Sequence, residues 1–159
     1  MKPIRAFIHG LESSSQGIKG AFFRERYPDM IIEDFSGSFS QRMVKLEDLL
    51  EGKQPLVLVG SSYGGLMAAV YACLHEERVK KLILLAPALH LEPYNPYLNK
   101  KLNLPITIFH GLQDEVVPLT TVRAIAEQLF VNHKFNAVED DHSLHTTFAA
   151  LDWDTLLSL

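Results

Sequence analysis

Short apolar runs and amphipathic stretches alternate along this chain. Runs rich in β-branched and other apolar residues, which favour strands, lie at residues 4–8, 30–32, 56–60, 81–86, 105–109 and 134–138. Stretches with apolar residues at helical spacing lie at 17–27, 40–51, 62–75, 120–131 and 143–157. Strands that alternate with helices predict an α/β fold, a three-layer sandwich around a mostly parallel central sheet of about six strands.

The segment 87–104 interrupts this alternation. It follows the fourth predicted strand and is irregular, with Pro93, Tyr94, Pro96 and Tyr97 close together. It occupies the place where a lid over a site at the sheet edge would sit. The chain has 159 residues and contains no repeat or Gly/Ser-rich linker. We therefore expect a single domain over residues 1–159, with 87–104 as a reduced lid region.

Composition and charge limit the kinds of partner that this protein is expected to bind. Apolar residues make up 47% of the chain and charged residues 21%, which is the balance of a soluble globular protein. The net charge of −4, without a long basic run, argues against nucleic-acid binding. No apolar run approaches the roughly 20 residues that span a bilayer. Cys73 is the only cysteine, and residues 1–8 are too short and interrupted for a signal peptide. These features predict a cytoplasmic protein with no membrane partner.

One short motif contains a candidate catalytic residue. Residues 60–64 read Gly-x-Ser-x-Gly, between an apolar strand-like run and a helix-like run rich in small residues. A strand, a sharp turn and a helix at this motif lift the central hydroxyl, that of Ser62, out of the bend. The N–H groups at the start of the following helix favour negative charge that develops beside it. The motif predicts that Ser62 is a nucleophile.

A serine hydroxyl needs a base to take its proton and a carboxylate to orient that base. Asp114 follows one predicted strand and His142 follows the last one, so both reach the sheet edge that carries Ser62. The order Ser, Asp, His is the one expected for this motif in an α/β sheet. Glu115 is a weaker candidate for the acid and His145 for the base. A metal site around residues 140–145 lacks a distant third ligand, so no metal is expected.

These motifs together resemble the α/β-hydrolase superfamily. The resemblance rests on His9-Gly10, on Gly-x-Ser-x-Gly at 60–64, on His-Gly-x-x-Asp-x-x-Val-Pro at 110–118 and on Asp-His at 141–142. It covers nearly the whole chain and is closest to small bacterial esterases of the YqiA type. It implies a minimal α/β-hydrolase fold without cofactors, with Ser62 as nucleophile, Asp114 as orienting acid and His142 as base.

The resemblance also implies further roles near the first predicted strand. Oxyanion donors would be the backbone N–H groups of Leu11 and Tyr63, and His9, Gly10 and Ser13 would lie at the substrate. His9 and His110 also fit a supporting role, because each precedes a glycine at a strand end. One position departs from the pattern: Asp140 stands where many relatives carry glycine. A carboxylate beside the base would favour imidazolium.

The sequence therefore predicts a serine hydrolase that cleaves short-chain carboxylic esters through an acyl-enzyme intermediate. A thioesterase or amidase with the same three residues is an alternative, because only the pocket would differ. A non-catalytic ligand-binding module on the same fold is a second alternative, since a fold does not fix a function. The expected partner is a small acyl ester, and the expected state is a monomer or a small homo-oligomer.

Overall fold

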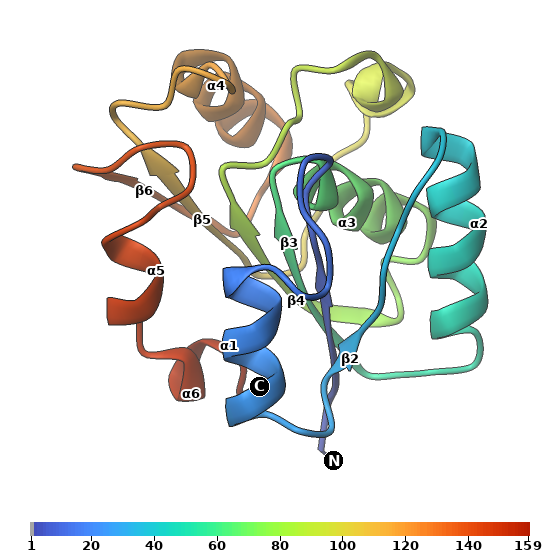
Figure 1. Ribbon diagram of the computed structural model, residues 1–159. Coiled ribbons are helices and arrows are strands. Elements are labelled where there is room, and N and C mark those ends of the chain that lie inside the picture. Colours follow the sequence, from blue (N-terminus) through green and yellow to red (C-terminus); the bar gives the residue numbers. More distant parts are fainter. Residues whose placement is uncertain (1) are drawn as a thin grey trace.

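A computed structural model describes residues 2–159 and contains one six-stranded sheet. All neighbouring strands pair in parallel, in the order β2-β1-β3-β4-β5-β6 (Figure 1). The strands are β1 (Ile4–Ile8), β2 (Ile31–Ile32), β3 (Leu56–Ser61), β4 (Val79–Leu85), β5 (Ile106–Gly111) and β6 (His133–Val138). The predicted α/β fold with a parallel sheet of about six strands is confirmed.

Helices cover both faces of this sheet, as Figure 1 shows. One face carries α1 (Ile18–Arg26), α5 (Thr147–Ala150) and α6 (Trp153–Leu156), and the other carries α2 (Phe39–Leu50), α3 (Tyr63–Leu74) and α4 (Leu119–Leu129). Strand side chains alternate between two buried clusters, because successive residues of a strand point to opposite faces. In β3, Leu58 joins the cluster under α3, whereas Val57 and Val59 join the aromatic cluster under α1.

The central helix α3 is buried almost all round. Nine of its residues, from Gly64 to Ala72, are buried. Its apolar character on every side therefore reflects its position between the sheet, α2 and the segment that follows β4. Its neighbour α2 has one apolar face and begins at a capping box, in which Ser38 and Gln41 satisfy each other's backbone N–H groups.

The predicted closing helix 143–157 is wrong as a single element. Residues 143–146 form turns, and the helical part divides into the four-residue helices α5 and α6. Leu144 has a positive φ of 52°, which no helix allows. Asp152 interrupts the helix because its side chain accepts the backbone N–H of Thr155 and starts α6 instead. The helix-like spacing of the apolar residues comes from their shared packing in the aromatic cluster, which includes Leu144, Phe148, Leu151 and Leu156.

The segment after β4 packs onto the core. It contains the 3₁₀ helix η1 (Glu92–Tyr97), which the sequence did not predict, and η1 lies against α3. Tyr94 is fully buried, with its hydroxyl 3.8 Å from Sγ of Cys73 on α3. Helix α4 begins at Leu119, directly after Pro118. Within residues 2–159, none of the helices combines the length and hydropathy that crossing a bilayer requires.

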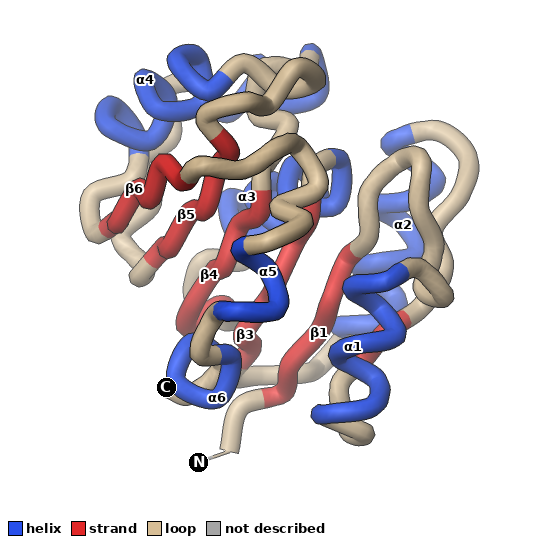
Figure 2. Tube along the Cα trace, turned by 60° about the vertical axis from the view of Figure 1, so that its left-hand side comes forward, coloured by secondary structure: helices blue, strands red, loops and turns tan. Residues whose placement is uncertain are grey.

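The order of the strands places a site at one edge of the sheet. The chain runs from β1 outward to β2 and then returns to β3 on the other side of β1. The carboxyl ends of β1 and β3 therefore flank a topological switch point, where ligands bind in open parallel sheets. The loops that follow the strands gather at this edge, which is uppermost in Figure 2. Ser62, Asp114 and His142 all lie on these loops.

Candidate active site

Ser62 sits in the turn between β3 and α3, in a conformation that ordinary residues avoid. Its φ is 55° and its ψ is −114°, and its backbone N–H donates to the carbonyl of Leu85 at 2.8 Å. The two motif glycines allow the backbones to approach closely. A Cβ on Gly60 would lie 2.4 Å from the carbonyl oxygen of Gly64, and one on Gly64 would lie 2.0 Å from that of Ile8. The strained turn is thus enforced by the surrounding backbone.

The structure brings Ser62, His142 and Asp114 into one hydrogen-bonded chain. Nε2 of His142 lies 3.0 Å from Oγ of Ser62, and Nδ1 of His142 lies 2.7 Å from Oδ2 of Asp114. In neutral His142 the Nδ1–H donates to the carboxylate, so Nε2 is free to accept the proton of the Ser62 hydroxyl. Residues 80 positions apart in the sequence thus meet at the sheet edge.

Asp114 is a carboxylate held by several donors. Its side chain is fully buried. Burial opposes its ionisation, but the N–H groups of Val117 and Val116, both 2.8 Å from Oδ1, and the imidazole of His142 outweigh that cost. The pKa of Asp114 consequently lies below its usual value, and the residue is a carboxylate at neutral pH. A fixed negative charge at this point orients the imidazole and stabilises its protonated form.

A second histidine touches the same carboxylate. Nε2 of the fully buried His110 lies 3.2 Å from Oδ2 of Asp114 and donates to the carbonyl of Val117 at 3.0 Å. Burial lowers the pKa of His110, so its ring is neutral. His110 thus fixes the loop that carries Asp114. The sequence suggested such a supporting role, but the contact with the carboxylate itself was not predicted.

Asp140 stabilises the loop that carries the base. Its Oδ2 accepts the N–H groups of Thr146 and Thr147, at 3.0 and 2.7 Å, and its Oδ1 accepts that of Asp141. Burial opposes ionisation here too, but these backbone donors lower the pKa of Asp140 to about 2. The carboxylate of Asp140 therefore binds the backbone N–H groups at the start of α5, and within residues 2–159 no hydrogen bond joins it to the imidazole of His142.

Sequence reasoning missed Lys19, which ties α1 to the same loop. Its Nζ donates to the backbone carbonyl of Ser143, the residue after the base, at 2.7 Å. Burial lowers the pKa of Lys19, and the charges of Asp141 and Asp140 oppose that shift. The two partners lie 124 positions apart. A lone lysine on an amphipathic helix carries no signal that would have revealed such a contact.

The predicted oxyanion donors flank Ser62. Within residues 2–159, the backbone N–H groups of Leu11 and Tyr63 make no hydrogen bond to another group of the protein. The loop that carries Leu11 approaches the nucleophile closely, because a Cβ on Gly10 would lie 3.4 Å from Cβ of Ser62. Both donors are thus available to a substrate oxygen, as developing negative charge requires.

The three expected substrate contacts differ in their surroundings. His9 is buried and both ring nitrogens bond to backbone: Nδ1 to the carbonyl of Gly10 at 2.7 Å, and Nε2 to the N–H of Phe35 at 2.9 Å. Its side chain therefore shapes the loop and offers a substrate no free polar atom. Gly10 lies beside Ser62, and Ser13 is exposed on the following turn.

The rival residues lie apart from the hydrogen-bonded chain. His145 is exposed and lies in the turn before α5, with its backbone N–H on Oδ1 of Asp141. Glu115 is exposed beside Asp114. Within residues 2–159, the acidic and histidine side chains form no group of three or more that could hold a metal ion.

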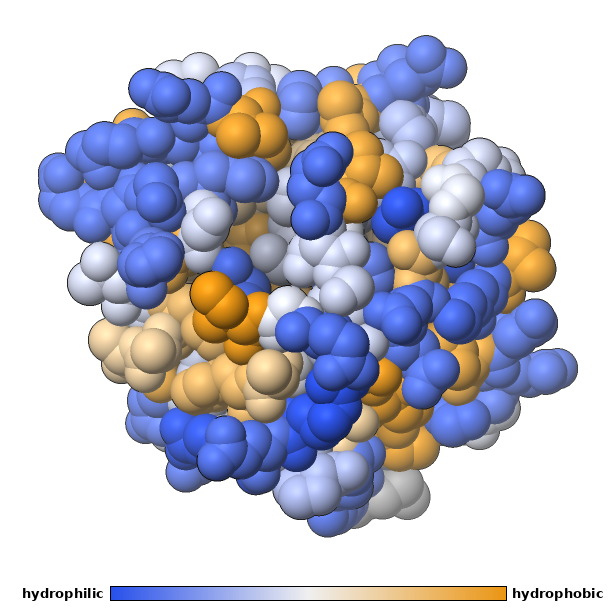
Figure 3. Space-filling model, in the orientation of Figure 1, coloured by the Kyte–Doolittle hydropathy of each residue, from blue (hydrophilic) through white to orange (hydrophobic). Residues whose placement is uncertain are grey.

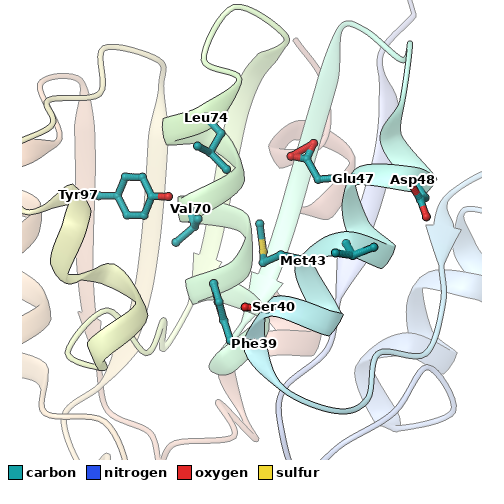
Figure 4. A pocket seen from close by; sticks show the side chains of 9 residues that line it. Phe39, Ser40, Met43, Glu47, Asp48, Val70, Leu74 and Tyr97 are labelled. Atoms are coloured by element: carbon teal, nitrogen blue, oxygen red, sulfur yellow. The ribbon is translucent and has the colours of Figure 1, made fainter.

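The surface has two hollows beside the helices. The larger, about 390 Å³, lies between α2, α3 and η1. Figure 4 shows Tyr97 facing Met43 across Val70, with Glu47 and Asp48 at one side. The smaller, about 140 Å³, lies between α1 and α5 and includes Ser143, the neighbour of His142. Ser62 lines neither of them, and its side chain is partly exposed.

Comparisons with known proteins agree with this architecture. Residues 13–94 match the family model described as alpha/beta hydrolase fold. Mouse alpha/beta hydrolase domain-containing protein 10 is 21% identical, with a TM-score of 0.80 over 99% of this chain and 87% of that one. Est1E from Butyrivibrio proteoclasticus is 20% identical, with a TM-score of 0.69 over 89% and 80% of the two chains.

The esterase EaEST from Exiguobacterium antarcticum is 14% identical, with a TM-score of 0.77 over 99% of this chain and 91% of that one. No curated protein matches this chain in sequence. At these identities the likeness to the solved structures concerns the fold.

Proposed function

The chain belongs to the α/β-hydrolase fold family, and on that basis we propose that it is a serine hydrolase that cleaves carboxylic esters through an acyl-enzyme intermediate. The observation that carries this proposal is the hydrogen-bonded chain from Ser62 through His142 to Asp114, at 3.0 and 2.7 Å. Those distances lie within the reach that proton transfer needs. The strained turn that presents Ser62 supports the same role.

The geometry supports the following sequence of steps. Oγ of Ser62 attacks the acyl carbon while Nε2 of His142 takes its proton. The carbonyl oxygen becomes an oxyanion facing the N–H groups of Leu11 and Tyr63, each such donor contributing about 3–4 kcal/mol to transition-state stabilisation. The intermediate collapses as His142 returns the proton to the departing alcohol oxygen. Water then attacks the acyl-enzyme by the same route, and Asp114 stabilises the imidazolium each time.

The cover over the site supports a preference for short acyl chains. We take residues 87–104 as a reduced lid, and its helix η1 is packed against α3 through the buried Tyr94. The His142 side chain retains 23% of its exposure, and Ser62 is partly exposed. A long acyl chain would find little enclosed apolar surface at this rim, so lengthening it adds little binding energy.

Hydrolysis of p-nitrophenyl esters tests this function. We expect turnover of the acetate and butyrate, a fall in kcat/KM for longer chains, and loss of turnover in Ser62→Ala with the fold retained by circular dichroism. Ser61→Ala, which changes the neighbouring hydroxyl, is the matched control and is expected to keep turnover. Turnover in Ser62→Ala would defeat the assignment of the nucleophile. Inert wild-type protein would favour the binding module, and faster cleavage of acyl thioesters would favour the thioesterase.

A further inference from the structure

An apolar hollow of about 140 Å³ lies between the first turns of α1 and the helix α5. Figure 3 shows apolar surface where these two helices face each other. The lining residues are Ile18, Lys19, Phe22, Ser143, Leu144, His145, Phe148 and Ala149. The catalytic steps proposed above use none of these side chains and therefore assign the hollow no function.

The walls of the hollow are packed apolar side chains, and its rim is exposed. Phe22 and Phe148 meet edge to face, with ring centroids 5.0 Å apart, and Leu144 is fully buried. Ile18 is 81% exposed, and Ala149 is also exposed. A group that enters the hollow therefore contacts these two apolar side chains first. An apolar cavity of about 150 Å³ lined by such residues accommodates a benzene ring. The hollow therefore has the size and lining for one aromatic ring or a branched aliphatic group of similar volume.

The position of the hollow indicates which part of a substrate it would receive. Ser143 and Leu144 directly follow His142 in the chain, so the hollow adjoins the loop that carries the imidazole. The predicted oxyanion donors belong to other segments, the loop after β1 and the start of α3. In the tetrahedral intermediate the departing alcohol oxygen must face Nε2 of His142, because that atom returns the proton. The group attached to that oxygen is therefore the one directed toward the hollow.

We propose that the hollow between α1 and α5 binds the alcohol portion of the ester, and that it selects an aromatic or branched alcohol over a small linear one. This inference rests on the proposed function. Burial of a ring between Phe22, Leu144 and Phe148 removes apolar surface from water in the bound ester, which raises kcat/KM relative to an ester whose alcohol is too small to fill the hollow.

Three esters test the proposal without any variant. Benzyl acetate carries the ring on the alcohol, its isomer methyl phenylacetate carries the same ring on the acyl group, and ethyl acetate carries none. We expect kcat/KM for benzyl acetate to exceed that for each of the other two by at least about tenfold. Equal values for the two isomers, or a preference for methyl phenylacetate, would overturn the assignment while leaving the esterase function intact. Failure to cleave any ester would overturn the proposed function itself.

A matched pair of variants locates the effect. Ala149→Phe places a ring in the hollow, whereas Ala150→Phe places the same ring on the next exposed residue of α5, which does not line it. We expect the ratio of kcat/KM between benzyl acetate and ethyl acetate to fall severalfold in Ala149→Phe and to stay unchanged in Ala150→Phe. The same ratio in both variants would place the discriminating surface elsewhere.

Discussion

At the scale of single residues, the geometry of the candidate site depends on the hydrogen bonds that fix the carboxylate of Asp114. Asp114 receives two backbone N–H groups on Oδ1 and faces two histidines with Oδ2. These contacts stabilise its charge and leave Oδ2 pointing at His142. The sequence predicted Asp114, because acid and base follow strands that end at the same edge. It did not predict the contact of His110 with that oxygen, because a histidine before a glycine fits several loop geometries equally well.

Replacing Asp114 by asparagine tests the orienting role. The asparagine amide can bind the His142 ring through its carbonyl or its NH₂, so it no longer selects one tautomer of the imidazole. The amide also carries no charge, so the imidazolium form of His142 is less stable. We expect kcat for p-nitrophenyl acetate to fall by about 10³–10⁴-fold with little change in KM. Glu115→Gln removes the neighbouring exposed carboxylate and is the control. A fall of less than tenfold in Asp114→Asn would mean that another group orients the base.

At the scale of elements, the loop between β6 and α5 is the part that the sequence described least well. The spacing of its apolar residues suggested one helix over 143–157, but burial in the shared aromatic cluster produces the same spacing from two short helices. The loop instead depends on specific hydrogen bonds. Asp140 binds N–H groups six and seven positions further on, at the start of α5, and Lys19 binds the carbonyl of Ser143, 124 positions away. Neither contact follows from the spacing of apolar residues, which is why sequence reasoning missed them.

We expect the hydrogen bond from Lys19 to Ser143 to affect kcat, although Lys19 takes no part in the proposed chemical steps. Lys19→Met keeps the length and apolar stem but removes the donor to Ser143, so the loop that positions His142 loses its tie to α1. Small displacements of a catalytic group are costly, and we expect kcat to fall by roughly 10- to 100-fold. Lys19→Arg, which restores a donor, should recover part of the rate.

The chain offers a matched control for this variant. Lys81 also donates to a backbone carbonyl, that of Ser158, at 2.8 Å near the end of the chain. Lys81→Met should leave kcat unchanged. Equal kinetic effects of the two variants would show that Lys19 acts only through general stability.

At the scale of the whole molecule, the sequence predicted the layers well because most strands contain an apolar run and alternate with helices. The central strands β3 and β4 are largely buried between two helical layers, and such strands can be recognised from their apolar runs. The short strand β2 and the helices α1 to α4 also agree closely with their predicted ranges. The helix η1 was not predicted, because its two prolines suggested an irregular segment. Its place is set by burial of Tyr94 against α3.

Asp140 links the pH to the stability of the fold. Its pKa is about 2 in the folded chain and 3.8 for an ordinary carboxyl, so its ionised form contributes stability above pH 3.8 that is lost as pH falls through 2. We expect Asp140→Asn to lower the free energy of unfolding by about 1 kcal/mol at pH 7, as for loss of a helix-capping carboxylate. The difference in the free energy of unfolding between Asp140→Asn and the wild type should shrink as pH approaches 2.

Urea unfolding at several pH values measures this gap. Glu139→Gln removes an exposed charge of the same loop, whose carboxylate accepts only from the side chain of Gln113, and serves as control. A gap for Asp140→Asn that persists unchanged at pH 2 would show that shape, rather than charge, accounts for its effect.

Covalent labelling tests the central claim most directly. A fluorophosphonate probe reacts with a serine only where a neighbouring base activates its hydroxyl, so it reports on the contact between Ser62 and His142. The account predicts one adduct per folded chain, located on Ser62 by peptide mass spectrometry, and its loss in Ser62→Ala and in His142→Ala. No adduct on folded wild-type protein, or an adduct on another serine, would contradict it.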